Sequence, residues 1–382
     1  MKRRDFLRKA AVGAAALSAV GGPVAGIAKA DPALPKRKLG KTNVEVSVHG
    51  CGTLHMPEDG YEEIIERVME LGVTYLDTAA CYQNGNVERR LATILPRVRD
   101  KLFLATKWHQ GGPVETFTTW LDDALQRMKV DDVDLVQVHN LSKAEEVTDE
   151  RIFEAFAQAK QAGKARFLGF TTHKNVDEVC TAGIGTGQYD TMLIRYGPLA
   201  DARDNLTAVV KKGYDAGLGV IGIKSQEGGK DFPGMENFTG DGVNIWQARV
   251  KWALSNPELS ILLTDCETLE HAEENTVAAM QEMTEADRRV IERYLALAGP
   301  HTCTWCGQCE RACPQGVRVA DIMRYEAYVT GYRQPATGRE GYARLPKEQT
   351  FAACDSCGAC EGACPNGLRV VQRLKEAHRV LA

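Results

Sequence analysis

The C-terminal region of the chain contains two cysteine runs with the same spacing. In each run three cysteines follow one another at intervals of three residues, and a fourth stands four residues later, directly before a proline. The runs comprise Cys303, Cys306, Cys309 and Cys313, then Cys354, Cys357, Cys360 and Cys364. Bacterial ferredoxins with two 4Fe-4S clusters use this spacing, and their fourth cysteine ligates the other cluster. We therefore predict two 4Fe-4S clusters near the C-terminus.

This crossover predicts how the eight thiolates are shared. One cluster takes Cys303, Cys306, Cys309 and Cys364, and the other takes Cys354, Cys357, Cys360 and Cys313. The alternatives are zinc sites or disulfides. Structural zinc sites usually join two separated Cys-x-x-Cys hooks, whereas each run here holds four cysteines within eleven residues. The repeated spacing favours clusters and predicts a protein that transfers electrons.

Four further cysteines lie far apart in the sequence: Cys51, Cys81, Cys180 and Cys266. We expect them to be free thiols or small apolar residues of the core. Pairing among them stays open, because connectivity cannot be deduced from sequence.

The N-terminal 30 residues have the pattern of a targeting segment. A basic stretch at residues 2–9 resembles a twin-arginine export signal, and an Ala/Gly-rich stretch follows at 10–28. The small residues Ala28 and Ala30 offer a cleavage site. A retained membrane anchor is the alternative, but residues 21–23, Gly-Gly-Pro, interrupt the apolar stretch. We therefore predict a signal at 1–30, a mature chain without a transmembrane span, and a periplasmic or extracytoplasmic location.

Export and clusters support each other, because the twin-arginine route carries folded proteins and a cluster protein must fold around its iron before export. The formal net charge is only −4, so nothing indicates nucleic-acid binding. The length remaining after cleavage suits one large domain and one small domain.

A regular alternation of short apolar runs and amphipathic stretches begins near residue 44. The eight apolar runs are 44–52, 73–77, 102–107, 133–139, 166–170, 191–196, 219–224 and 259–263. Helix candidates between them are 61–71, 114–128, 149–162, 206–216 and 245–255. Eight such units predict an α/β fold, a parallel (β/α)8 TIM barrel. An open doubly wound sheet is the alternative, but no Gly-rich loop follows the first strand.

Sequence breaks predict the domain limits. A short hairpin at 37–44 precedes the barrel, and a helix at 285–297 ends at Ala-Gly-Pro, 298–300. We place the barrel at 36–282 and a small α+β ferredoxin-like two-cluster domain at 299–382. Between the cysteine runs we expect a helix at 319–329 and a polar loop at 331–341. A last helix at 368–381 is expected to dock on the barrel or on the clusters.

Three predicted strands end in ionisable residues, namely Asp77, Lys107 and His139, and Tyr82 lies in the loop after Asp77. Catalytic groups of such barrels stand at these strand ends. A free tyrosine ionises near pH ~10. A neighbouring lysine held by an aspartate should lower the pKa of the tyrosine. The set predicts that Tyr82 transfers a proton at a carbonyl or alcohol oxygen that His139 orients.

Each of these residues also has an ordinary structural explanation. Asp77 and Lys107 alone would be an ion pair, His139 alone a core histidine, and Tyr82 alone a packed loop residue. Their joint occurrence at the ends of neighbouring strands favours catalysis.

These residues lie in segments that resemble the aldo/keto reductase family, a barrel family with an Asp-Tyr-Lys-His tetrad. The resemblance covers about residues 36–282, and it is closest to a subgroup with an appended ferredoxin-like domain. It implies a small carbonyl or alcohol substrate. The matching segments are 75–79 with Tyr82, 86–88, 105–107, 134–140, 163–170 and Glu274-Asn275.

The resemblance also implies a nicotinamide dinucleotide, NAD(P), extended across the strand ends. Residues carried over for it are Thr171, His173, Tyr196, Lys224, Glu274 and Asn275. Lys224 either binds a phosphate or shapes the barrel mouth.

The sequence departs from the family's cofactor pattern at three places. Leu193 replaces the usual glutamine, and Gly197 replaces an asparagine. Asp265 and Glu267 follow the eighth strand, where family members often carry a base for the 2′-phosphate. Acidic residues repel a phosphate, so NADP preference is not expected.

We thus predict an exported iron-sulfur oxidoreductase that reduces a carbonyl or oxidises an alcohol. A free nicotinamide pool is not expected outside the cytoplasm, so the clusters and a redox partner protein are candidate electron sources. The alternative is an electron-transfer subunit whose barrel is a non-catalytic scaffold.

Overall fold

The computed structural model describes residues 33–109, 114–226, 243–332 and 334–382. Residues from Ala33 to Ala382 belong to one compact unit. The predicted export signal at 1–30 lies outside the described residues. None of the described helices is long and apolar enough to cross a membrane.

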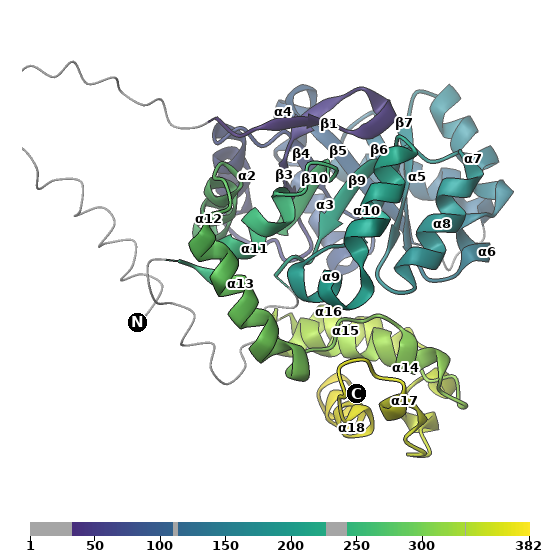
Figure 1. Cartoon of the computed structure of the whole chain (residues 1–382). Helices are drawn as coiled ribbons and strands as arrows, with labels where there is room; N and C mark the ends of the chain where they lie inside the picture. The colour runs from purple at the N-terminus through teal and green to yellow at the C-terminus, as the bar shows by residue number, and fades with distance from the viewer. Residues whose placement is uncertain (1–32, 110–113, 227–242, 333) are drawn as a thin grey trace, which may run out of the picture. The chain divides into compact units, whose positions relative to one another are not determined.

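Eight parallel strands close into a barrel, in which the last strand pairs with the first (Figure 1). The strands are β3 (His49–Gly52), β4 (Tyr75–Asp77), β5 (Phe103–His109), β6 (Val133–Leu141), β7 (Ala165–Thr172), β8 (Thr191–Arg195), β9 (Gly219–Ile223) and β10 (Ile261–Asp265). The predicted (β/α)8 barrel is confirmed. The first strand begins later than expected, because Glu45–Ser47 forms β2 and pairs with β1 (Lys36–Lys38) in an antiparallel hairpin.

Helices surround the barrel and bury one face each. They include α2 (Tyr61–Glu70), α5 (Phe117–Met128), α7 (Glu150–Gln161), α8 (Val176–Thr186), α10 (Leu206–Asp215), α11 (Ile245–Leu254) and α12 (Leu269–Ala279). In α2, for example, Ile64, Ile65 and Val68 recur at helical spacing and are buried. This apolar face holds the helix against the strands.

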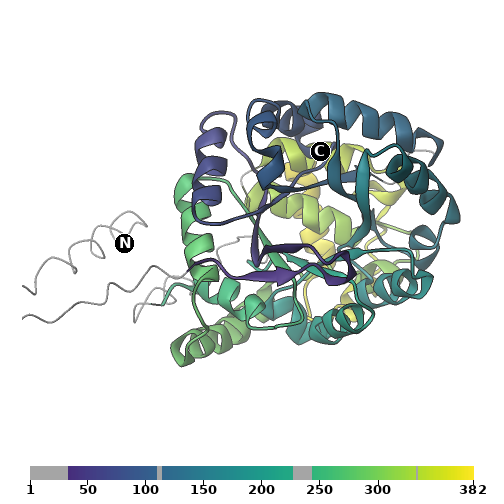
Figure 2. The same cartoon turned by 90° about the horizontal axis from the view of Figure 1, so that it is seen from above.

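Alternate strand residues build two apolar layers, because successive side chains of a strand point to opposite faces. Tyr75 and Ile221 pack inside the barrel, whereas Leu76 and Val220 pack between strands and helices. Leu39 from the hairpin joins the inner layer. The hairpin lies across one end of the barrel, and the C-terminal helices lie at the other end (Figure 2).

Barrel closure brings two distant cysteines together. Cys51 of β3 stands beside Thr264 of β10, and Cys266 follows β10 directly. The Cα atoms of Cys51 and Cys266 are 5.9 Å apart, and the two residues form a disulfide. The expectation of free thiols is therefore wrong for this pair, because closure of the barrel places the first and last strands, and with them these two cysteines, side by side. Cys81 and Cys180 are free.

The chain continues from α13 (Glu285–Ala298) into a small domain with its own apolar core. Its helices are α14 (Gln308–Arg311), α15 (Val319–Thr330), α16 (Pro335–Ala343), α17 (Ala359–Gly362) and α18 (Val370–Leu381). Trp305, Val317, Ile322 and Leu374 are among the buried residues of this core. The predicted helices at 285–297, 319–329 and 368–381 are present as α13, α15 and α18.

One detail of the small domain differs from expectation. Its described residues form helices and turns without a strand, so the α+β description does not hold for this part. In each cysteine run a left-handed glycine, Gly307 or Gly358, leads directly into a short helix.

The loop expected at 331–341 is also wrong, because α16 covers most of it. Pro335 suits the first turn of a helix. Gly338 and Gly341 face α15 so closely that a Cβ at either position would overlap Tyr325. Tight packing against α15 therefore outweighs the poor helix propensity of glycine.

Two glycines of α8 offer a matched test of the barrel shell. A Cβ at buried Gly183 would lie 2.8 Å from the ring of Phe170 and 3.0 Å from Val147, whereas nothing lies within 4 Å of such an atom at Gly185. We expect Gly183→Ala to lower stability by about 1–3 kcal/mol through overpacking. Gly185→Ala should raise it by up to about 1 kcal/mol. Thermal unfolding of both variants measures this, and equal melting temperatures would contradict the packing.

Candidate active site

The ends of β4, β5 and β6 bring the predicted catalytic residues together. The ammonium group of Lys107 donates hydrogen bonds to Asp77 Oδ1, to the carbonyl oxygen of Thr78 at 2.8 Å and to the hydroxyl of Tyr82 at 3.0 Å. Gln137 donates to the second oxygen of Asp77 at 3.0 Å. Lys107 and Asp77 are both buried. The lysine is therefore held in one position beside the phenol.

The pKa of Tyr82 differs from expectation. Burial of Tyr82 raises its pKa well above the usual value, and the negative charge of Asp77 adds to this. The predicted lowering by Lys107 is therefore wrong for this closed site, because desolvation of the phenolate outweighs the nearby cation. Tyr82 is a neutral phenol at neutral pH, which is the form that donates a proton.

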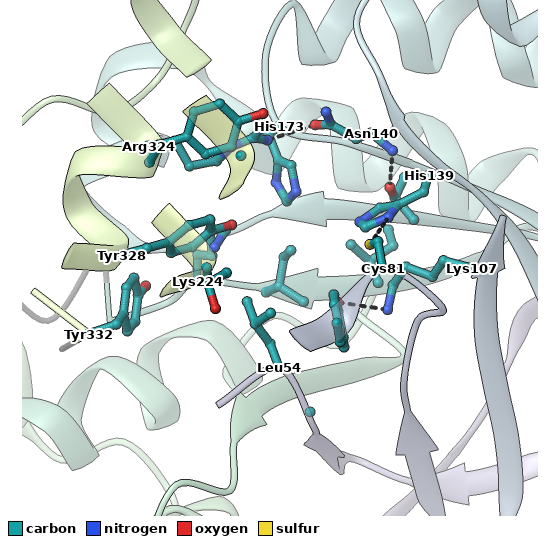
Figure 3. A pocket seen from close by; sticks show the side chains of 18 of the residues that line it. Leu54, Cys81, Lys107, His139, Asn140, His173, Lys224, Arg324, Tyr328 and Tyr332 are labelled. Atoms are coloured by element: carbon teal, nitrogen blue, oxygen red, sulfur yellow. Dashed lines mark hydrogen bonds between the residues drawn. The ribbon is translucent and has the colours of Figure 1, made fainter. Parts of the chain in front are cut away.

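His139 stands beside Tyr82 with the two rings at 75° and their centroids 6.1 Å apart. The sulfur of Cys81 lies 3.5 Å from Nδ1 of His139 (Figure 3). Burial raises the pKa of Cys81 to about 11, so the group is a neutral thiol. When the thiol donates its hydrogen to Nδ1, the proton of the neutral imidazole lies on Nε2. The Nε2–H group can then donate a hydrogen bond to a carbonyl oxygen. Sequence reasoning missed Cys81, although it directly precedes Tyr82.

The four residues line a cavity of about 330 Å³ that the small domain covers. We use the term roof for the side chains of Arg324, Tyr325, Tyr328 and Tyr332, which line the cavity from α15 and the turn after it. Residues of α16 also line it. The last helix, α18, packs in the core of the small domain and lines both cysteine cavities, in agreement with the expectation that it docks on the clusters.

Buried ion pairs hold the roof on the barrel. Lys174, which follows β7, donates to Glu310 at 2.6 Å and to Asp321 at 2.8 Å. Arg324 donates to Asp321 at 3.0 Å and to Asn140, which lies in β6, at 2.6 Å. Lys174, Asp321 and Arg324 are each about 95% buried. Burial opposes ionisation of Asp321, but the cations around it hold its pKa far below the usual range.

The eight cysteines of the two runs surround two small cavities. Cys303, Cys306, Cys309 and Cys364 line one of them, and Cys313, Cys354, Cys357 and Cys360 line the other. Among the described side chains no three metal-binding groups converge as a site for one ion would require. Four thiols around a cavity instead suit a multi-iron cluster, whose irons each take one thiolate. The residues therefore fit 4Fe-4S clusters in the predicted crossover groups.

Comparison with known proteins agrees with this arrangement. Residues 49–230 match the model of the aldo/keto reductase family, and residues 302–369 match that of the 4Fe-4S dicluster domain. The chain is thus similar to aldo/keto reductases over its barrel and to 4Fe-4S dicluster domains over its C-terminal part.

Curated relatives of the aldo/keto reductase domain include oxidoreductases of bacteria and plants. The uncharacterized oxidoreductase YqkF of Bacillus subtilis is 32% identical over 36% of this chain and 48% of its own length. Methylglyoxal reductase DkgB of Escherichia coli O157:H7 is 26% identical over 41% of this chain and 60% of its own length. The match to L-galactose dehydrogenase of Arabidopsis thaliana, at 24% identity, covers 70% of this chain and 96% of that protein. The chain thus spans about half to 60% of the first two relatives.

A solved structure shows the same barrel. The aldo-keto reductase AKR11C1 from Bacillus halodurans, in its holo form, superimposes with a TM-score of 0.59 at 20% identity. The alignment covers 68% of this chain and 96% of that one.

The family resemblance implies six residues for binding a nicotinamide cofactor, and only some of them line the cavity. Thr171, His173 and Lys224 line it. Tyr196 lies outside the lining, with its hydroxyl bonded to Thr207 at 2.8 Å and its ring packed on Trp252.

Glu274 and Asn275, which lie on α12, are also outside the lining. Asn275 accepts a hydrogen bond from Gln226 at 3.0 Å. Both residues therefore stay at the barrel wall.

The roof lies over part of the path that an extended dinucleotide would take. Tyr328 and Tyr332 cover Lys224 at the end of β9, with ring centroids 5.1 and 5.5 Å from its ammonium nitrogen. His55 stacks on Tyr332 at 4.6 Å and contacts Asp265 at 3.0 Å, at the end of β10. The cavity still reaches Leu193, Gln226 and Thr264 at the ends of β8, β9 and β10, so the roof narrows this path without closing it, and we derive no step through a nicotinamide.

A nicotinamide titration checks this conclusion. We expect NADH and NADPH to bind the cluster-loaded protein only weakly, because Tyr328 and Tyr332 stand over Lys224 on the path across the strand ends. Fluorescence of the reduced nicotinamide under anaerobic conditions measures binding. Tight, stoichiometric binding of either nucleotide would show that the roof does not obstruct this path.

Two lysines test the anchor of the roof. Removal of one member of a buried ion pair costs about 3–5 kcal/mol, so we expect Lys174→Met to lower stability by that order. Lys164→Met removes an ion pair to Asp122 at the surface and should cost about 0–1 kcal/mol. Chemical unfolding of both variants gives the difference. Equal losses would show that Lys174 does not hold the roof.

Proposed function

We propose that the protein is an exported iron-sulfur oxidoreductase that reduces a small carbonyl compound, or oxidises the corresponding alcohol, in the barrel cavity. One observation carries the proposal. Lys107 links Asp77 to the hydroxyl of Tyr82 inside a cavity whose opposite wall comes from the cluster domain. A proton-transfer group and a redox domain therefore border the same space.

The chemistry of Tyr82 fits carbonyl reduction. Reduction of a carbonyl to an alcohol adds a hydride, or two electrons and a proton, to carbon and a second proton to oxygen; a nicotinamide, if bound, would supply the hydride. The neutral phenol donates the proton to oxygen, and the adjacent ammonium of Lys107 stabilises the phenolate that remains. His139 donates a hydrogen bond to the same oxygen and orients it. The roof limits contact with water, which strengthens these interactions.

The clusters supply one electron at a time when they are bound. The chain's own contribution is to hold them through the two cysteine groups. Cys357 is exposed, which places the second group at the protein surface. We propose that a redox partner protein exchanges electrons there.

Two further features support parts of the proposal. The basic segment at residues 2–9, with the small residues that follow, supports export in a folded state. Two relatives are named for their activities, a methylglyoxal reductase and an L-galactose dehydrogenase, and these support a small carbonyl or alcohol substrate.

A second candidate is an electron-transfer subunit whose barrel is a scaffold. The roof over the mouth and the outward position of Tyr196 favour it. The bonded set of Asp77, Lys107 and Tyr82 favours the enzyme, because a scaffold has no need of it.

Substitution of the phenol separates the two candidates. We expect Tyr82→Phe to lower carbonyl turnover about 10²–10⁴-fold, because the proton donor is lost. Turnover of a panel of small aldehydes and ketones is followed with reduced viologen as electron donor. Tyr214→Phe, at an exposed position, is the matched control and should leave turnover unchanged.

Iron content and the EPR signal of the reduced clusters must be equal in both variants. Turnover that survives Tyr82→Phe would refute the role of the phenol. Absence of turnover in the unmodified protein, with electron transfer to a partner intact, would favour the scaffold.

A further inference from the structure

Lys224 stands across the cavity from the catalytic residues. Figure 3 shows it beside Tyr328 and Tyr332, whereas Lys107 and Cys81 lie on the opposite side. Its backbone φ is +59°, in the left-handed region that residues other than glycine rarely adopt. Such a conformation at the end of a strand is a reason to look for function.

The surroundings of the Lys224 ammonium group are aromatic. Its nitrogen lies 5.1 Å from the ring centroid of Tyr328, 5.5 Å from that of Tyr332 and 5.6 Å from that of Trp305. Each such contact attracts the cation to the face of a ring and holds the charge in place. The faces of the rings attract the cation but leave its three N–H donors without strong acceptors.

In the part of the chain that the structure describes, the other Lys and Arg side chains that line the cavity each have a carboxylate partner, unlike Lys224. Lys107 is paired with Asp77, Arg324 with Asp321, and Arg344 with Glu340; Arg318 pairs with Glu310 and Asp321. Among the residues that the structure describes, no carboxylate lies within 4.0 Å of the Lys224 nitrogen. Its charge is therefore available to a ligand.

Two other groups face this wall. Burial, with the charges of Arg324 and Lys224, lowers the pKa of His173 well below its usual value, so His173 is neutral. Asp265 is the nearby anion from β10, and its Oδ2 contacts Nδ1 of His55 at 3.0 Å. Burial opposes ionisation of Asp265, but His55 and the charge of Lys224 hold its pKa below the usual value. Asp265 therefore offsets part of the Lys224 charge without contacting the ammonium group, which keeps its donors for an incoming anion.

We propose that Lys224 binds the carboxylate of the substrate, so that the cavity takes an oxo acid or the corresponding hydroxy acid. The reacting carbonyl or hydroxyl lies at Tyr82 and His139, and the carboxylate lies at Lys224. The cavity of about 330 Å³ suits a small molecule of this kind. The inference rests on the proposed function, because it places the reacting oxygen at Tyr82.

The pyrophosphate of a dinucleotide is the other source of anionic oxygens. Tyr328 and Tyr332 stand over Lys224, which favours a small carboxylate over an extended dinucleotide at this position. The test below distinguishes the two sources.

Matched acids and esters test the carboxylate site. Acetoacetate, 4-oxopentanoate and 5-oxohexanoate are each compared with their methyl esters by calorimetric titration of the anaerobic, cluster-loaded full chain. We expect at least one acid to bind tenfold or more tightly than its ester. In Lys224→Met this ratio should fall to about one, and Lys224→Arg should keep most of it. A ratio near one in the unmodified protein, or an unchanged ratio in Lys224→Met, would overturn the proposal.

The controls distinguish carboxylate binding by Lys224 from a purely structural role of this residue, and test it independently of the proposed function. If Lys224 only clamped the roof, Lys224→Met would weaken acids and esters alike and leave the ratio unchanged. Lys211 forms an exposed ion pair with Asp215, so Lys211→Met should change neither the binding of the acids nor that of the esters. NADH binding that is lost in Lys224→Met would assign the lysine to a pyrophosphate and overturn the proposal.

Tyr82→Phe should abolish turnover and keep the acid-to-ester ratio. Failure of the proposed function and failure of the carboxylate site therefore give different results.

Discussion

The buried ion pairs around Asp321 determine how the two halves of the chain work together. Lys174 from the barrel and Arg324 from α15 both bind this carboxylate, and each is almost fully removed from water. Desolvation of such groups is expensive, so the arrangement persists only while all partners stay in place. Because α15 carries the roof tyrosines, these contacts also set the size of the cavity, the burial of Tyr82 and the aromatic surroundings of Lys224. A surface pair could not impose one geometry in this way.

Much of the architecture was predictable because its signals are local. Eight apolar runs with amphipathic stretches between them are sufficient for a parallel barrel, and the parallel strands then bring Asp77, Lys107 and His139 to the same end. The cysteine groups follow from spacing alone, because a cluster of fixed size takes thiolates at fixed intervals. In each case neighbouring residues carry the information.

The features that escaped prediction depend on distant contacts. Lys174 and Asp321 are 147 residues apart, and nothing near either residue indicates the other. The outward position of Tyr196 depends on Thr207 and Trp252, and the high pKa of Tyr82 depends on a roof that was not foreseen. The helix α16 forms in a segment rich in glycine because α15 leaves room for no side chain there. Propensity and spacing cannot report such packing.

The small domain's core has a consequence for the supply of iron. Cys309 and Cys360 belong to that core together with Ile322 and Leu374, so side chains expected to hold the clusters also pack beneath α15. Because α15 carries most of the roof, the cluster sites and the substrate cavity share one set of packed side chains. A change in how iron is held is therefore expected to affect the cavity.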